Sequence, residues 1–106
     1  MNDLIQGIYS EARRAGVKLG FVAYPVTYQI SIEGADDFPQ RELERKLKSR
    51  DVPMLDLLPM LREHYQRTNT LPYYDEAHPT EVGNRLIAGA ILDFVEREKL
   101  LAQPHQ

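Results

Sequence analysis

The alternation of apolar and polar positions is clearest toward the carboxyl end of the chain. Over residues 79–97 apolar side chains recur with the spacing 4-1-3-1-3-1, at Val82, Leu86, Ile87, Ala90, Ile91, Phe94 and Val95. This spacing gives an α-helix one apolar face and one polar face. Pro79 suits the first helical position, because its φ is already helical and its missing N–H would have no partner there. The pattern predicts an amphipathic helix over residues 79–97.

A second amphipathic helix is predicted near the amino end, over residues 3–15. Its apolar face is formed by Leu4, Ile5, Ile8, Ala12 and Ala15. Gly16 follows where a left-handed residue commonly ends a helix. Helices are also expected over residues 39–49, which Pro39 opens, and over residues 57–67.

Two strands are expected between these helices, over residues 17–24 and 52–56. The first is continuously apolar from Gly20 to Tyr24, which is typical of a strand covered on both faces in a parallel sheet. Residues 31–37 are polar and contain Gly34, so they read as a surface loop, with some residual strand around residues 29–32. Helices that alternate with strands predict a layered α/β domain.

The order of these elements directs attention to the carboxyl ends of the strands. In open α/β sheets the ligand crevice lies outside those ends. Thr27, Tyr28 and Gln29 follow the first strand and either line such a pocket or pack as an ordinary loop. Asp56 ends the second strand and either acts in the crevice or caps the helix that follows.

Length, composition and charge exclude several function classes. One hundred and six residues make one domain or part of one, and 42% hydrophobic with 27% charged residues is ordinary for a globular chain. A net charge of −3 predicts no nucleic-acid partner. No apolar run is long enough to cross a bilayer, and the start of the chain does not resemble a signal peptide. The absence of cysteine excludes disulfides and leaves the cellular compartment open.

The candidate chemistry lies in the polar turn Asp75-Glu76-Ala77-His78, directly before the last helix. A carboxylate and an imidazole in one short turn suit a carboxylate that orients a general-base histidine. The structural alternative is that Asp75 caps the last helix and His78 is a surface residue. Tyr73 and Tyr74 precede the turn and either border a pocket or contribute to packing.

A metal site is a further alternative, with His64, His78 and Asp75 as two histidines and one carboxylate. His64 lies on a separate predicted helix, and its spacing does not tie it to the other two residues. We therefore expect no metal and no other cofactor.

The turn also carries a family resemblance. The run Asp75-x-x-His78-Pro79-Thr80-x-x-Gly83-Asn84, followed by an apolar helix, resembles the last conserved block of the SGNH hydrolases, the GDSL-type esterases and lipases. Residues 52–59 (VPMLDLLP) are similar to a late strand of the same family. The resemblance implies a flavodoxin-like α/β/α architecture, of which residues 1–98 would be the carboxyl-terminal part and residues 99–106 a tail.

The resemblance also implies a reaction. A serine would attack an ester carbonyl, His78 would act as base and then as acid, and Asp75 would hold the imidazole. The outcome would be hydrolysis of a small-molecule, lipid or carbohydrate ester, or transfer of its acyl group.

The other blocks of that family are not found in these residues. None of Ser10, Ser31 and Ser49 follows Gly-Asp, and no Gly-x-Asn-Asp stretch exists. We expect the chain to be inactive alone and to need an amino-terminal half or a partner chain to complete its sheet and triad. The alternative is a non-catalytic α/β interaction module, or a truncated relic, that pairs with a partner by strand addition.

Overall fold

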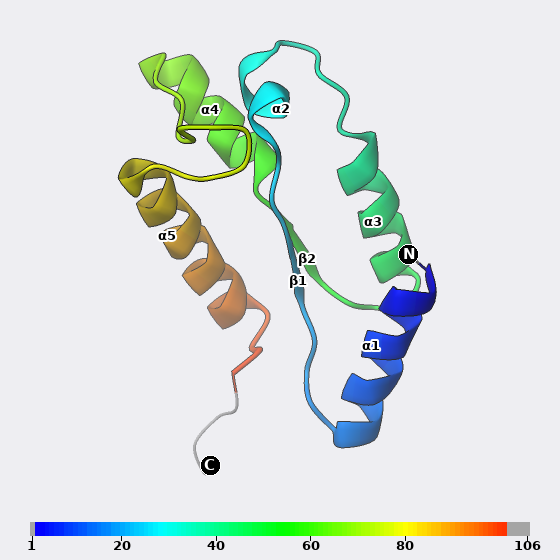
Figure 1. Ribbon diagram of the computed structural model, residues 1–106. Helices are drawn as coiled ribbons and strands as arrows, with labels where there is room; N and C mark the ends of the chain where they lie inside the picture. Colours follow the sequence, from blue (N-terminus) through cyan, green and yellow to red (C-terminus); the bar gives the residue numbers. More distant parts are fainter. Residues whose placement is uncertain (1, 102–106) are drawn as a thin grey trace.

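Helices and short strands alternate along the chain in the computed structural model, which describes residues 2–101 (Figure 1). The elements are α1 (Asn2–Ala15), β1 (Phe21–Ala23), α2 (Thr27–Ser31), α3 (Phe38–Lys48), β2 (Met54–Asp56), α4 (Leu58–Thr68) and α5 (Glu81–Arg97). The fold is therefore mixed α/β, as the alternating pattern predicted.

The two strands form a parallel pair at the centre of the molecule. Phe21 pairs with Met54, and Ala23 pairs with Asp56. The N–H of Leu57 donates to the carbonyl of Ala23 at 3.1 Å, so the ladder continues one residue past β2. Within residues 2–101 the sheet has these two strands, β1 and β2.

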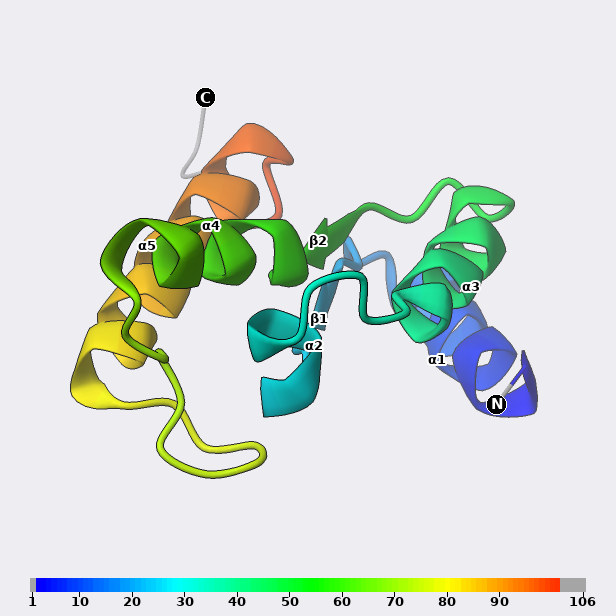
Figure 2. The ribbon, with the colours of Figure 1, turned by 90° about the horizontal axis from the view of Figure 1, so that it is seen from above.

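Helices cover both faces of this sheet. Viewed from above, α1 and α3 lie on one side of the strands, and α4 and α5 lie on the other (Figure 2). Alternate strand residues explain the two layers, since Phe21 faces the first pair of helices and Val22 the second. The prediction of a strand covered on both faces is confirmed.

Each layer has its own apolar cluster. The cluster on the α1 and α3 side is built from Ile5, Leu47 and Val52, with Tyr9, Leu19, Phe21, Leu43 and Met54 against it. The cluster on the α4 and α5 side is larger and includes Ile30, Leu57, Leu58, Leu61, Tyr73 and Ile87. The second cluster matters for the candidate site, because it fixes α2 and the segment before α5.

Helix α1 agrees with its predicted range but not with all of its predicted apolar face. Ile5 and Ala12 are buried, whereas Leu4 is 64% exposed and Ile8 is also exposed. Leu4 and Ile8 lie on a flank of the helix that no other described element covers. Gly16 has φ of 72°, which confirms the expected left-handed end of the helix.

Two strand predictions are wrong in extent or kind. The strand expected over residues 17–24 is only Phe21–Ala23, because β2 offers three residues to pair with. The residual strand expected around residues 29–32 is not present, since Thr27–Ser31 is the short helix α2. The five-residue helix is too short to show helical periodicity in its sequence.

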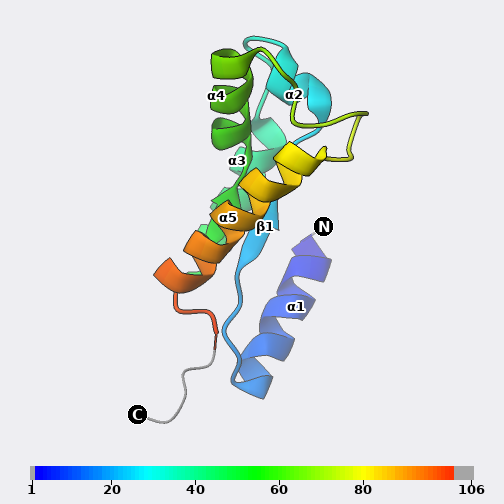
Figure 3. The same ribbon diagram turned by 90° about the vertical axis from the view of Figure 1, so that its left-hand side faces the viewer.

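The later helices begin and end within one or two residues of their predicted ranges. The helix expected from residue 79 begins at Glu81, with Thr80 as its N-cap, so Pro79 does not take the first helical position. Val82 is exposed rather than buried, while Ile87 and Phe94 are buried as predicted. Figure 3 shows the segment that joins α4 to α5 next to α2, where the N–H of Thr27 donates to the carbonyl of Glu76.

Candidate active site

The turn with Asp75 and His78 is a closed loop between α4 and α5. Its two ends meet in an isolated antiparallel bridge between Tyr73 and Pro79. The N–H of Tyr74 donates to the carbonyl of His78 at 3.0 Å. The loop therefore has a defined base, and Asp75 and His78 are held on its exposed side.

Asp75 organises the loop through its carboxylate. Oδ1 accepts the backbone N–H of Ala77 at 3.0 Å and that of His78 at 2.8 Å. These backbone bonds, followed by the contact with the imidazole, hold the pKa of the Asp75 carboxyl below its usual value. Asp75 is therefore a carboxylate at neutral pH. Its side chain is 54% exposed, and contact with water also favours the charged form.

The imidazole of His78 is oriented by the same carboxylate. Its Nδ1 lies 2.9 Å from Oδ1 and 2.8 Å from Oδ2 of Asp75. An ionised carboxylate can only accept, so Nδ1 must carry the proton. In the neutral ring Nε2 is then the nitrogen with the free lone pair, and the side chain is 68% exposed.

This arrangement can perform general-base chemistry. The carboxylate fixes the tautomer and stabilises the imidazolium that forms when Nε2 takes a proton. The ring of Tyr74 packs against the imidazole edge-on, with centroids 6.1 Å apart. The Asp75–His78 pair that the sequence singled out is therefore in direct contact, with its base nitrogen free for a proton donor.

The carboxyl end of the loop is anchored to α5 through Thr80. The hydroxyl of Thr80 accepts the N–H of Gly83 at 3.0 Å and donates to the carbonyl of Pro72 at 3.1 Å. The N–H of Thr80 also donates to Pro72, at 2.8 Å. Thr80, not Asp75, caps the last helix, so the capping alternative for Asp75 is wrong.

Gly83 is required by the same anchor. A Cβ at this position would lie 2.1 Å from the carbonyl oxygen of Pro72, which is a backbone atom with little freedom to move. Glycine thus lets the first turn of α5 approach the loop closely enough for Thr80 to form its bonds.

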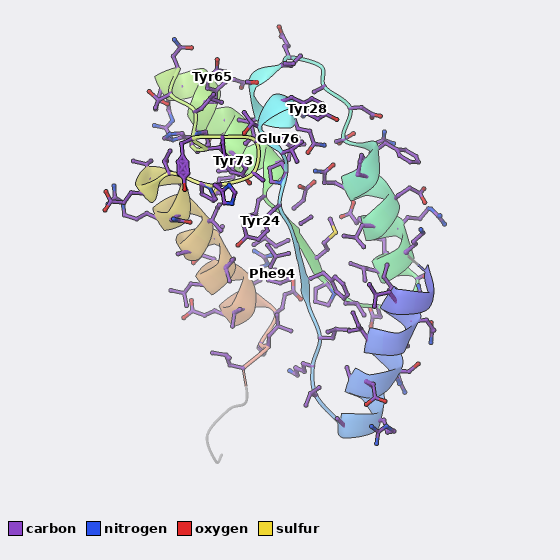
Figure 4. The ribbon with its side chains drawn as sticks, in the orientation of Figure 1. Tyr24, Tyr28, Tyr65, Tyr73, Glu76 and Phe94 are labelled. Atoms are coloured by element: carbon purple, nitrogen blue, oxygen red, sulfur yellow. The ribbon has the colours of Figure 1, made fainter. Side chains whose placement is uncertain are left out.

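The other side of the loop is held by α2. The hydroxyl of Thr27 donates to the carbonyl of Asp75, and the N–H of Thr27 donates to the carbonyl of Glu76 at 2.9 Å. In Figure 4, Tyr28 and Glu76 lie together at this end of the molecule, with Tyr24 close to the strand end. The loop is therefore attached to the connection that follows β1.

The other residues that the sequence singled out have different environments. Tyr28 is exposed, and Gln29 is buried and hydrogen-bonded to Gln40, so Gln29 does not line a pocket. Asp56 accepts the N–H of Leu58 at 3.0 Å, but the N-cap position of α4 is Leu57, so Asp56 supports the start of the helix from one residue before the observed N-cap. Burial, the largest cause, raises the pKa of the Asp56 carboxyl.

The two tyrosines before the turn differ. Tyr73 is buried in the larger apolar cluster, and burial raises the pKa of its hydroxyl. That hydroxyl has no hydrogen-bond partner among residues 2–101. Tyr74 is exposed and lines the surface beside His78.

The metal alternative finds no support in the described part of the chain. Across residues 2–101 no group of three or more His, Asp or Glu side chains is placed to hold a metal ion. His64 lies on α4, and its Nδ1 is buried without a partner in this region.

No serine is hydrogen-bonded to His78 in the part of the chain that the structure describes. Ser10 accepts a hydrogen bond from Gln6 on α1, Ser49 donates to the carbonyl of Lys46 after α3, and Ser31 ends α2. No hydrogen bond joins any of these serines to His78 in residues 2–101.

Sequence reasoning missed the contact between Thr27 and the loop. It placed Thr27 near the crevice but treated the segment as a connection, because α2 is short and polar. One signal was present: Gln29 lies three residues after Val26, and its side chain accepts the N–H of Val26 at 3.0 Å, as in half of a capping box.

Comparisons with protein-family models, with curated proteins and with solved structures found no match to this chain. None of the helices within residues 2–101 is long and apolar enough to cross a membrane. The geometry of the Asp75–His78 loop is thus the main basis for a functional proposal.

Proposed function

We propose that this chain is the carboxyl-terminal part of an SGNH-type serine hydrolase domain, in which Asp75 and His78 are two members of a Ser-His-Asp triad. One observation carries the proposal. Both carboxylate oxygens of Asp75 lie within 2.9 Å of His78 Nδ1, which leaves Nε2 as the exposed base. The reaction would be hydrolysis of a carboxylic ester or transfer of its acyl group.

The surroundings of the pair support this function. The loop is bonded to the segment after the carboxyl end of β1, where ligands bind in open α/β sheets. Helices on both faces of a parallel sheet are compatible with the flavodoxin-like architecture of the family. The VPMLDLLP run forms β2 and the start of α4.

In the proposed mechanism each residue has one role. Nε2 of His78 takes the hydroxyl proton as the serine oxygen attacks the ester carbonyl, and later returns that proton to the departing alcohol. Asp75 holds the imidazole through Nδ1 and stabilises its positive charge. The serine and the oxyanion donors would come from outside residues 1–106, from an amino-terminal half or a partner chain.

The test uses the product isolated from its source cells. An intact mass well above 12.2 kDa, together with a serine outside residues 1–106 that a fluorophosphonate probe labels, is the expected result. In that protein His78→Ala should lower kcat for a p-nitrophenyl ester at least about a hundredfold. His64→Ala is the matched control, since no hydrogen bond joins the His64 imidazole to Asp75 or His78 among residues 2–101. A rate unchanged by His78→Ala would refute His78 as the base.

A second candidate is a non-catalytic module that binds a partner by strand addition. The observation in its favour is that β1 and β2 pair only with each other in the described residues, so each strand has an unpaired edge. The two candidate functions can be distinguished experimentally, because the hydrolase requires a nucleophilic serine and the binding module does not. A partner that binds His78→Ala and the unmodified chain equally, with no probe-labelled serine in the complex, would favour the module.

A further inference from the structure

We infer that Thr27 is a positioning residue for the Asp75–His78 pair, which it ties to the carboxyl end of β1 through two hydrogen bonds. The inference rests on the proposed function, because positioning has a catalytic meaning only if His78 is the base. It goes beyond that function by assigning a role to a residue outside the Asp-x-x-His block.

The two bonds reach the part of the loop that the helix anchor does not. Thr80 holds the loop at Pro72, next to the bridge between Tyr73 and Pro79. Thr27 instead bonds the carbonyls of Asp75 and Glu76, on the far side of the loop. Without Thr27 the backbone that carries the carboxylate would have an anchor at its base only.

Thr27 can hold the loop because α2 is itself fixed. Gln29 and Gln40 are both buried, and each side-chain amide donates to the other at 3.0 Å. Arg62 on α4 donates to the carbonyl of Gln29 at 2.8 Å and to that of Ala35 at 2.7 Å. Ile30 is buried in the larger apolar cluster. A five-residue helix would not be rigid alone, but these contacts tie it to α3 and α4.

The position of Thr27 in the chain, shortly after β1, links the loop to the sheet. Thr27 follows closely on Ala23, the last residue of β1, and Pro25 within that connection is fully buried. The loop is thus fixed relative to the carboxyl end of the sheet as well as to α5. A nucleophile held at the carboxyl end of the sheet would then find Nε2 of His78 in a fixed position. This matters because a small misplacement of a catalytic base lowers the reaction rate strongly.

The experiment compares two substitutions at Thr27 with one elsewhere. Thr27→Val removes the hydroxyl bond to Asp75 and keeps the side-chain shape, whereas Thr27→Ser keeps the hydroxyl. Thr68→Val is the matched control, because the hydroxyl of Thr68 also donates to a backbone carbonyl, that of His64 at 2.8 Å, and its other bonds are to Thr70, which precedes the loop. All three variants are made in the 106-residue chain and, for kinetics, in the native product isolated from its source cells.

The first readout is NMR of the 106-residue chain and needs no activity. Thr27→Val should raise the midpoint of the Asp75 carboxyl titration toward its ordinary value and lower the population of Nδ1-protonated His78, since a loosened loop weakens the bonds to the carboxylate. Thr27→Ser should restore both signals, and Thr68→Val should leave them unchanged. Unchanged signals in Thr27→Val would overturn the inference.

The second readout separates the inference from the proposed function. In the native product Thr27→Val should lower kcat roughly two- to tenfold with little change in KM, the size expected for one hydrogen bond. If His78→Ala abolishes turnover but Thr27→Val does not alter kcat, the inference fails and the proposed function stands. If His78→Ala leaves turnover intact, the proposed function fails, and the catalytic role of Thr27 fails with it.

Discussion

At the scale of single residues, two aspartates show how local surroundings set the charge state. Asp75 is exposed and accepts two backbone N–H groups and an imidazole, so its pKa lies below the ordinary value. Asp56 accepts one backbone N–H but is partly buried, and burial outweighs that bond, so its pKa lies above the ordinary value. The first residue can support catalysis as a permanent carboxylate, whereas the second has a structural role at some cost in stability.

We predict that Asp56→Asn stabilises the chain at neutral pH. A raised pKa in the folded state means that folding disfavours the charged carboxyl, so the free energy of unfolding falls as pH rises from the unfolded pKa through the higher folded pKa. The amide keeps an oxygen that can accept the N–H of Leu58 but carries no charge. Urea unfolding should show the Asp56→Asn variant more stable than the unmodified chain at about pH 7 and nearly equal to it at about pH 3.

The control at the same position separates charge from hydrogen bonding. Asp56→Ala removes the acceptor for Leu58 as well as the charge, and leaving a partly buried N–H without its acceptor costs about 1–3 kcal/mol. Asp56→Ala should therefore be less stable than Asp56→Asn at every pH. Equal stability of the two variants would show that the bond to Leu58 contributes nothing.

At the scale of elements, the first turn of α5 decides where the candidate site lies. The helix begins at Glu81 rather than at Pro79, because the hydroxyl of Thr80 accepts the N–H of Gly83 and its own N–H donates to Pro72. Pro79 is then free to close the bridge with Tyr73. The first turn of the helix and the loop form one unit, so a change in that first turn should alter the surroundings of His78.

We predict opposite effects for two glycine substitutions in α5. Gly83→Ala should destabilise the chain by about 1–3 kcal/mol, because the new Cβ would lie against the carbonyl of Pro72 and push the loop away. Gly89→Ala should stabilise it by about 0.5–1 kcal/mol, because a Cβ at position 89 meets no atom within 4 Å and alanine favours helix. Urea unfolding of both variants checks the difference.

A second measurement connects this prediction to the site. The ring nitrogen shifts of His78 should change in Gly83→Ala and stay constant in Gly89→Ala. If both variants behave like the unmodified chain, the close contact between α5 and the loop does not position His78.

At the scale of the whole molecule, no serine among the described residues is hydrogen-bonded to the candidate base. Ser10 lies on α1 and Ser49 follows α3, and both of these helices cover the face of the sheet opposite α4 and α5. Ser31 ends α2, and its hydroxyl forms no bond with His78 in the described residues. The sheet within residues 2–101 is also small, since two strands bury little surface compared with an ordinary α/β domain.

We therefore predict that the 106-residue chain alone does not react with a fluorophosphonate probe. No serine among its described residues has His78 as a partner to remove its proton, so labelling at Ser10, Ser31 and Ser49 should not exceed that of the urea-unfolded chain. Mass spectrometry of tryptic peptides would measure it. Specific labelling of one serine that disappears in His78→Ala would mean that this chain brings its own nucleophile.

Local physical chemistry explains why much of the fold was predictable from sequence. Helices α1, α3, α4 and α5 follow from apolar residues at helical spacing, and Gly16 marks the end of α1 through its left-handed backbone. The contact between Asp75 and His78 was predictable for the same reason, since a single short turn of chain brings the two side chains together. The α/β class followed from the order of the elements.

Contacts between distant segments could not be inferred in this way. These contacts determine the length of the strands, the exposure of apolar side chains and the anchoring of the loop. The length of β1 depends on how much of β2 is available to pair with it, and the exposure of Leu4 depends on which element covers α1. The bonds of Thr27 to residues 48 or more positions away, and the approach of Gly83 to Pro72, exist only because packing brings those segments together. The sequence by itself determined the pair that carries the proposed chemistry, because that pair is local, and only the tertiary structure decided what holds it in place.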